Sequence, residues 1–237
     1  MKVLKKISKT VIIAFTASLL LIAATINMDA NPTTFDIILP DEAQTQTGKT
    51  YGEWSVELWQ YFLEIPFENN PIFDATGANC NYAQTGSVFF LVSTPGGSAT
   101  RNECRVPAGK ILFFSPLNIA GFTHQKEPEH SLRNYNRSFI NSTRELQVSI
   151  DGTDVATLVS LEPRSTPLRA ASPEGFFTII APENNIFGGV PGQSYDTVSD
   201  GFYLLVAPLP PGAHTIKFGG VSRNFAADVT YNLIVEP

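Results

Sequence analysis

Four polar residues after position 50 recur at helical spacing and could do chemistry together. Glu53, Glu57, Gln60 and Glu64 occupy positions i, i+4, i+7 and i+11, so they project from one stripe of a helix. No lysine or arginine lies between Lys49 and Arg101 to neutralise this stripe locally. Carboxylate oxygens suit Ca²⁺ or a cationic partner; the alternative is a solvated helix face on which Glu53 also caps the helix. The sequence requires no cofactor, and Ca²⁺ is the ion that the stripe would bind.

A pair of carboxylates is the second chemical hypothesis. Glycoside hydrolysis uses two carboxyl groups about 5–10 Å apart across a cleft. Glu53 or Glu57, paired with Asp74, would supply them after folding. The chain holds 22 acidic residues, so the sequence does not single out this pair. No GxSxG elbow or phosphate-binding glycine motif points to other enzyme chemistry.

The two tryptophans of the chain offer a sugar-binding hypothesis, because aromatic faces stack on apolar sugar faces. Trp54 falls at the centre of the apolar helix face, so we expect it in the core. Trp59 lies to one side of that face. It is a candidate platform for a glycan, with burial in the core as the alternative.

The three histidines give a weaker signal. His124 and His130 lie in a polar segment with Glu127 and Glu129, an arrangement that could bind a transition metal. Two histidines six residues apart without regular structure are a poor metal signature. His214 follows a Pro-Pro-Gly turn, and we expect it to order that turn.

Residues 1–30 have the pattern of a secretory signal peptide. Four lysines precede an apolar run from Val11 to Ala24, which is shorter than the ~20 residues of a membrane-spanning helix. Cleavage after Ala30 would leave a secreted or extracytoplasmic protein without membrane insertion; an uncleaved anchor is the alternative. Removal of this segment makes the chain more acidic than its full-length net charge of −6. That acidity argues against a nucleic-acid partner.

Cys80 and Cys104 are the only cysteines. In an oxidising compartment they are most simply one disulfide. Closing a loop of about 25 residues would stabilise the fold by about 3–4 kcal/mol on the chain-entropy model.

The remaining pattern predicts an all-β fold with one N-terminal amphipathic helix. Residues 31–47 are expected to be an extended lead-in, and residues 50–65 a helix that starts at a Thr50–Glu53 capping box and stops at Pro66. Short β-rich runs with turn signals follow at 87–94, 110–115, 146–150, 155–161, 176–181, 201–207, 214–218 and 228–235. They favour a two-sheet β-sandwich over residues 48–237, jelly-roll or immunoglobulin-like in strand order. The polar segments 116–144 and 182–200 are expected to be long loops, where binding usually resides.

Several motifs together resemble a family of uncharacterised secreted proteins, mostly bacterial. They are Tyr51–Ser55 with Trp59-Gln60, Asn70-Pro71, Asp74, Thr76-Gly77, Cys80, Arg101, Cys104, Val106–Lys110, Phe113-Phe114, Asp200–Phe202 and Leu209–Ile216. Leu58 stands where the resemblance would place a second aromatic residue before Trp59. The resemblance implies secretion and a common fold, and it implies no chemistry.

The sequence therefore predicts an exported, non-catalytic module that binds a glycan, an ion or a protein partner at the cell surface or in the envelope. The alternative is a secreted polysaccharide hydrolase that uses carboxylates, and a third hypothesis is a purely structural envelope component.

Overall fold

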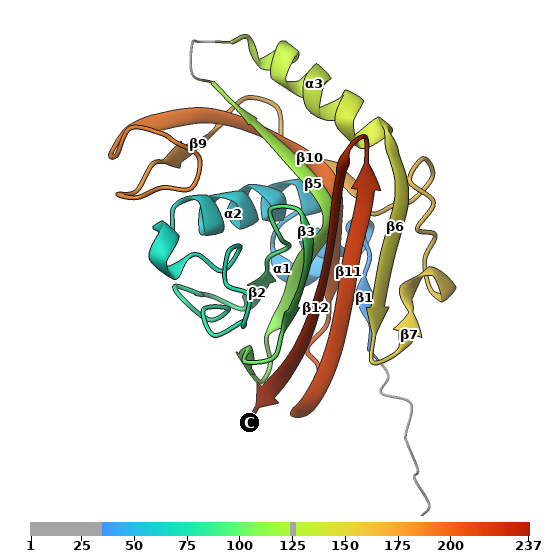
Figure 1. Cartoon of the computed structure of the whole chain (residues 1–237). Helices are drawn as coiled ribbons and strands as arrows, with labels where there is room; N and C mark the ends of the chain where they lie inside the picture. Colours follow the sequence, from blue (N-terminus) through green and yellow to red (C-terminus); the bar gives the residue numbers. More distant parts are fainter. Residues whose placement is uncertain (1–34, 124–126) are drawn as a thin grey trace, which may run out of the picture. The chain divides into compact units, whose positions relative to one another are not determined.

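The computed structural model describes residues 35–123 and 127–237 (Figure 1). The predicted signal peptide, residues 1–30, and His124 lie outside the described residues. Two six-stranded sheets pack together, so the predicted two-sheet β-sandwich is confirmed. None of the described helices is long and apolar enough to cross a membrane.

Sheet A has the strand order β1-β10-β5-β2, and β8 and β9 also pair with β10. Its strands are β1 (Ile37–Ile38), β2 (Val88–Leu91), β5 (Ile111–Phe122), β8 (Arg169–Ala171), β9 (Phe177–Ile180) and β10 (Ser194–Val206). The long β5 and β10 are antiparallel, whereas β2 runs parallel to β5.

Sheet B has the order β3-β12-β11-β6-β7, and β4 also pairs with β12. Its strands are β3 (Gly97–Arg101), β4 (Arg105–Pro107), β6 (Thr143–Ile150), β7 (Thr153–Asp154), β11 (Gly212–Ser222) and β12 (Phe225–Glu236). Both β3 and β4 run parallel to β12. Side chains alternate along β12, where Val229, Tyr231, Leu233 and Val235 are all buried.

Sheet A is covered on both faces. Phe113 of β5 contacts the rings of Tyr51 and Trp54 on helix α2 (Tyr51–Leu63) at 6.1 and 6.5 Å. The next residue, Phe114, stacks on Phe218 of sheet B at 4.6 Å. Successive side chains of a strand point to opposite faces, so α2 and sheet B lie on opposite sides of β5. Burial on both sides explains why the first residues of β5 are continuously apolar and do not alternate between apolar and polar.

Helix α2 confirms the predicted helix, with ends at Tyr51 and Leu63 rather than at 50 and 65. Its capping box is formed: Thr50 Oγ1 accepts from the N–H of Glu53 at 3.3 Å, and Glu53 Oε2 accepts from the N–H of Thr50 at 2.7 Å. The hydroxyl of Tyr51 joins the helix to sheet A, because it donates to the carbonyl of Ile38 and accepts from the N–H of Leu205.

The prediction of an extended lead-in at 31–47 is wrong for its second half, where helix α1 (Pro40–Thr47) forms. Pro40 starts the helix, the N–H of Leu39 donates to Glu42 Oε2 at 3.3 Å, and Gly48 ends it at φ +81°. Ala43 is its buried residue. A polar helix with so little apolar surface leaves no periodic signal in the sequence.

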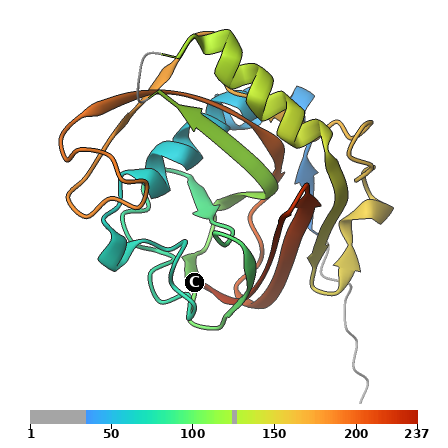
Figure 2. The ribbon, with the colours of Figure 1, turned by 45° about the horizontal axis from the view of Figure 1, so that its top comes forward.

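Much of the predicted 116–144 loop is regular structure. β5 continues to Phe122, and helix α3 (Glu129–Asn141) follows it and packs across β5 and β10 (Figure 2). Gly121 permits this packing, since a Cβ there would lie 3.4 Å from Leu132 and 3.2 Å from the side chain of Asn136. The predicted loop 182–200 is likewise too long, because β10 begins at Ser194.

The predicted strand at 155–161 is wrong; a tight turn and the short strand β7 lie just before it. β6 turns through Asp151 and Gly152, at φ +50° and +79°, into the two-residue strand β7. The chain then forms a short 3-10 helix, η2 (Val155–Thr157), capped by Asp154 Oδ1. The short strands β3, β4 and β8 were not predicted; each pairs at the side of a longer strand.

Cys80 and Cys104 form the predicted disulfide. Beside it Arg101 is buried, with 1% of its surface exposed. Its guanidinium donates to neutral acceptors, namely the carbonyls of Ile72, Asp74, Val92 and Ser93 and the hydroxyl of Tyr231. Arg101 and the disulfide thus fasten the turns of residues 70–80 to both sheets.

Candidate functional site

An apolar cleft of about 290 Å³ lies beyond the end of β2, beside β5. β2 accompanies β5 only over Ile111–Phe114, whereas β10 lines the other side of β5 as far as Phe122. After Leu91 the chain leaves sheet A and turns through Gly96 into β3. The side of β5 that faces away from β10 is therefore left open, and we call this hollow the β5 cleft.

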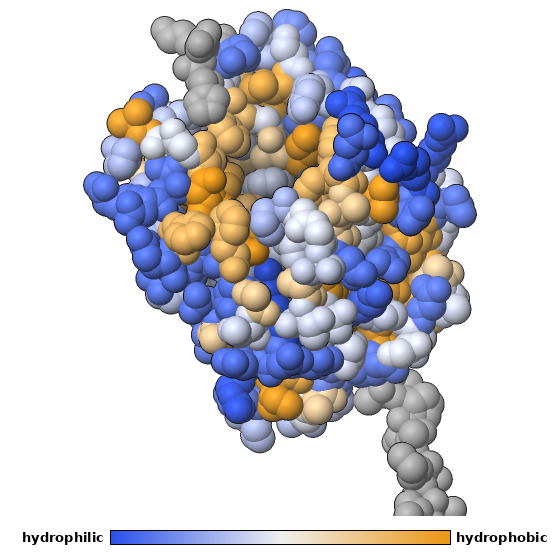
Figure 3. Space-filling model, viewed as in Figure 1, coloured by the Kyte–Doolittle hydropathy of each residue, from blue (hydrophilic) through white to orange (hydrophobic). Residues whose placement is uncertain are grey.

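Residues from several parts of the fold form the walls of the β5 cleft. Helix α2 supplies Leu58, Trp59 and Phe62 on one side. The far side is Phe139 of α3 and Phe225, which starts β12; their rings lie 6.1 Å apart. The floor is β5 from residue 115 to 120, and the segment 91–95 closes one end. In Figure 3 the face over α2 and β5 is hollowed, and hydrophobic side chains border the hollow.

Asn118 brings an unpaired side-chain amide to the β5 cleft. Its amide makes no hydrogen bond within the described residues, although it lines the cleft. Gly201, opposite Asn118 on β10, makes room for it, because a Cβ at position 201 would lie 2.6 Å from the Cβ of Asn118. An amide offers both a donor and an acceptor, so Asn118 gives the apolar cleft one point of polar recognition.

Three polar atoms near the β5 cleft are buried without hydrogen bonds of normal geometry: Trp59 Nε1, Ser93 Oγ and the hydroxyl of Tyr203. The Tyr203 hydroxyl interacts with Trp59, Ser55 and Ser199, but none of them is a well-placed partner. Burial raises the pKa of Tyr203, so its hydroxyl stays neutral at physiological pH.

The predicted glutamate stripe is formed, but its members serve separate structural contacts. Glu53 caps α2, and hydrogen bonds from Thr50 lower its pKa. Glu57 pairs with Lys49. Gln60 Nε2 donates to the carbonyl of Thr178, and Glu64 Oε1 accepts from the N–H of Ile180, both at 2.9 Å on the edge of β9. Residues 35–123 and 127–237 hold no group of three acidic, histidine or cysteine side chains that could bind a metal ion.

Asp74 does not join Glu53 or Glu57 in a shared site. Glu53 and Glu57 line a groove between α2 and residues 172–177, and Asp74 is not among the residues of that groove. Its carboxylate accepts from the N–H groups of Thr76 and Asn79 at 2.8 and 2.7 Å and orders the turn before the disulfide. Burial alone would raise the pKa of Asp74, but these hydrogen bonds outweigh it and lower the pKa.

The two tryptophans occupy different environments. Trp54 is buried as predicted, and its Nε1 donates to Thr47 Oγ1 at 2.7 Å. Trp59 is partly buried and forms a wall of the β5 cleft. Its ring lies 4.8 Å from that of Phe62, so it belongs to an apolar wall rather than to an isolated sugar platform.

The histidine predictions have mixed outcomes. His130 is exposed on α3, and His124 lies outside the described residues, so their predicted cluster stays a prediction. Neighbouring Glu129 forms an ion pair with Arg133, and the hydrogen bond from Arg133 lowers the pKa of the Glu129 carboxyl. His214 orders its turn as predicted: its ring nitrogens lie 2.7 Å from Asp151 Oδ2 and 2.8 Å from the carbonyl of Pro210.

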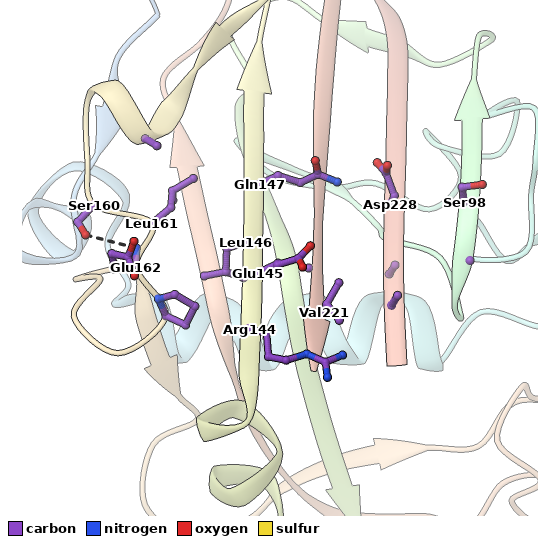
Figure 4. A pocket seen from close by; sticks show the side chains of 16 residues that line it. Ser98, Arg144, Glu145, Leu146, Gln147, Ser160, Leu161, Glu162, Val221 and Asp228 are labelled. Carbon is purple, nitrogen blue, oxygen red and sulfur yellow. Dashed lines mark hydrogen bonds between the residues drawn. The ribbon is translucent and has the colours of Figure 1, made fainter. Parts of the chain in front are cut away.

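A second hollow, of about 840 Å³, lies over the outer face of sheet B (Figure 4). Glu145 and Gln147 of β6 and Asp228 of β12 project into it, and the loop of residues 156–163 borders it. Asp228 Oδ2 pairs with Lys217 at 3.2 Å, and both side chains are partly exposed. This groove is larger and more polar than the β5 cleft, and the described residues that line it include no aromatic side chain to serve as a platform for a sugar.

Sequence reasoning missed the residues that make the β5 cleft, apart from Trp59. Asn118 and Ala120 fell in a segment expected to be a loop. The apolar residues of 117–122 were the available signal, but Pro116 and Gly121 favoured a break in the strand.

Comparison with known proteins does not assign this chain to a family. No family model matches the sequence, and no curated protein matches it. Among solved structures, the cysteine protease inhibitor EhICP2 from Entamoeba histolytica aligns at 12% identity, covering 63% of this chain and 96% of its own, with a TM-score of 0.25. PbICP-C, solved in complex with falcipain-2, aligns at 12% identity over 64% of this chain and 100% of its own, also with a TM-score of 0.25. Similarity at this level carries no argument about function, and the resemblance to a secreted family stays a prediction.

Proposed function

We propose that the protein is an exported, non-catalytic binding module that receives its ligand in the β5 cleft. The supporting observation is the composition of the cleft: apolar walls from α2, α3 and both sheets, with one free amide at Asn118. Apolar hollows with a few polar groups are the usual form of a ligand site. The volume of about 290 Å³ is near the lower end of such sites.

The lining of the cleft favours binding over catalysis. General acid–base and nucleophilic catalysis need titratable or activated groups close to the substrate. The described residues that line the β5 cleft include hydroxyls, such as Ser115, but no histidine, carboxylate, lysine or arginine to activate them. Ser115 Oγ is already committed, because it donates to the carbonyl of Phe202 at 2.7 Å.

The test uses a neutral, environment-sensitive dye, N-phenyl-1-naphthylamine, with the purified protein. We expect its fluorescence to rise on binding, and Ala120→Phe, which fills the cleft, to weaken binding at least tenfold. Ala156→Phe places the same ring in the groove of sheet B and should leave binding unchanged. Equal binding by both variants, or release of reducing ends from a polysaccharide panel, would overturn the proposal.

A further inference from the structure

We propose that the occupant of the β5 cleft is an extended, uncharged segment of a partner polypeptide, which adds to the open side of β5 as a strand. This inference rests on the proposed binding function and specifies the class of its ligand.

The backbone of β5 presents unpaired hydrogen-bonding groups to the cleft. The N–H of Thr123 donates to the carbonyl of Asp196 on β10 at 2.9 Å, and the register of the two strands is unbroken between Leu117 and Phe122. Backbone groups of an antiparallel strand point alternately to its two sides. Those of Asn118 and Ala120 therefore point away from β10. In the part of the chain that the structure describes, no strand pairs with that side of β5 beyond Phe114.

The β5 cleft is also covered on two opposite faces, as a strand within a packed sheet is. Leu58 and Trp59 of α2 cover one face, while Phe139 and Phe225 cover the other. Side chains of a strand point alternately to its two faces, and each residue advances about 3.3 Å. A segment of about four to six residues would therefore span the open part of β5 and bury side chains on both faces.

The chemistry of the walls sets the character of this segment. None of the described residues that line the β5 cleft is charged, so an occupant with a charge would lose its hydration without gaining a partner. Both covering faces are apolar, which selects apolar side chains at successive positions. The free amide of Asn118 can pair with a backbone amide or a hydroxyl of the same segment.

A small apolar molecule is the competing occupant, and it would use the cleft differently. It could fill the space between Trp59 and Phe225, but it could not pair with successive backbone groups of β5. Addition of a strand to an open sheet edge relies on those main-chain hydrogen bonds, with side-chain pockets for specificity. The two kinds of occupant are therefore distinguished by whether the backbone of β5 forms hydrogen bonds with the bound molecule.

The first experiment measures binding of purified protein to an array of acetylated, amidated hexapeptides composed of Val, Ile, Leu, Phe, Thr and Ser. The best binder is then N-methylated either at its odd-numbered or at its even-numbered residues. Each of these two phases of methylation blocks one edge of the peptide backbone. We expect one phase to weaken binding at least tenfold and the other to leave it unchanged. Hydrogen exchange should show the amides of Asn118 and Ala120 becoming protected only when peptide is bound.

A variant of the protein provides the matching test. Ala120→Pro removes an N–H that faces the cleft and leaves the bonds of Ile119 and Gly121 to β10 in place; proline is tolerated at such open strand edges. We expect Ala120→Pro to lose peptide binding at least tenfold and Ala120→Ser to retain it. The N-methylated peptides keep the proposal testable if the proline variant does not fold.

The outcomes separate this inference from the binding function on which it rests. Dye binding without binding of any peptide would keep the binding function and overturn the strand occupant. The same holds for peptide binding that is unaffected by either phase of methylation. Binding of neither dye nor peptide would overturn both.

Discussion

Arg101 is a buried cation whose hydrogen-bond partners are all neutral. Its five bonds reach the turn of residues 72–74, the segment 92–93 and β12, so the side chain joins parts of the chain far apart in sequence. The planar guanidinium suits this role, because its donors point outward in a fixed fork. Its positive charge is stabilised by carbonyl dipoles and by the ring of Tyr231, 5.0 Å away.

Arg101→Met should lower the free energy of unfolding by about 3–5 kcal/mol, because it leaves several buried carbonyls without donors. Urea unfolding measures the change. Arg105→Met is the control, since Arg105 pairs with Glu236 on the surface. Loss of such an exposed pair should cost less than about 1 kcal/mol. Similar losses for the two variants would contradict the role given to Arg101.

Two buried tyrosines provide a matched pair of substitutions. Tyr51→Phe should lower the free energy of unfolding by about 1–3 kcal/mol, because Ile38 and Leu205 lose their partner. Tyr203→Phe should change it by less than about 1 kcal/mol, because its hydroxyl has no well-placed partner to lose. Thermal unfolding of both variants tests the difference, and a larger loss for Tyr203→Phe would refute it.

Asp74 should contribute to the pH dependence of stability. Its pKa is lower in the folded protein than in the unfolded chain, so its contribution is present above the unfolded pKa and is lost as pH falls through the folded one. Asp74→Asn should destabilise the protein at pH 7 and reduce the decline in stability below about pH 4. Urea unfolding between pH 7 and pH 2 checks this; parallel curves for variant and wild type would contradict it.

Helix α2 fixes the edge strand β9 through side chains rather than through a strand partner. Gln60 and Glu64 reach the carbonyl of Thr178 and the N–H of Ile180, on the edge that faces away from β10. This arrangement gives the unpaired part of the edge strand polar partners within the molecule, which limits its tendency to pair with other chains.

Glu64→Ala should increase hydrogen exchange at the amide of Ile180 by about twofold to tenfold, the range expected for one net hydrogen bond. Glu64→Gln keeps an acceptor oxygen and should leave exchange close to wild type. The amide of Ile119, on the bonded side of β5, serves as an internal reference. Unchanged protection of Ile180 in Glu64→Ala would show that the bond does not hold β9.

Elements with a strong local signal were predicted correctly, and those that depend on distant neighbours were not. The capping box at Thr50 and the aromatic periodicity after it fix α2, and Asp151-Gly152 fixes the β6 turn. Helix α3 has few apolar residues, and Gly121 looks like a loop residue until α3 packs on it. The β5 cleft could not be predicted, because it exists only where β2 ends and β5 continues.

The stripe of glutamates shows why spacing alone does not define a site. The residues share a helix face as expected, yet Glu53 serves the helix cap, Glu57 pairs with nearby Lys49, and Glu64 bonds the distant strand β9. The binding of Ca²⁺ remains a prediction from the spacing of these residues, and the described geometry gives it no cluster of ligands.

For the whole molecule, the disulfide should be a major source of stability. Cys80 and Cys104 are separated by 24 residues and lie beside Arg101, where the turns of residues 70–80 join the sheets. Replacement of both by alanine should lower the free energy of unfolding by about 3–4 kcal/mol. Urea unfolding with and without reductant measures this; reductant should destabilise the wild type but not the double variant. Equal stability in oxidised and reduced wild type would contradict it.

The central place of β12 in sheet B bears on the timing of folding. Synthesis delivers β3 and β4 first, while β12, with which both pair in parallel, follows after the strands and helices between them. Pairings between segments so far apart in sequence form slowly. Sheet B therefore cannot close before β12 has been synthesised. If the chain is exported as proposed, this late closure would help to keep it able to thread through a narrow translocation pore.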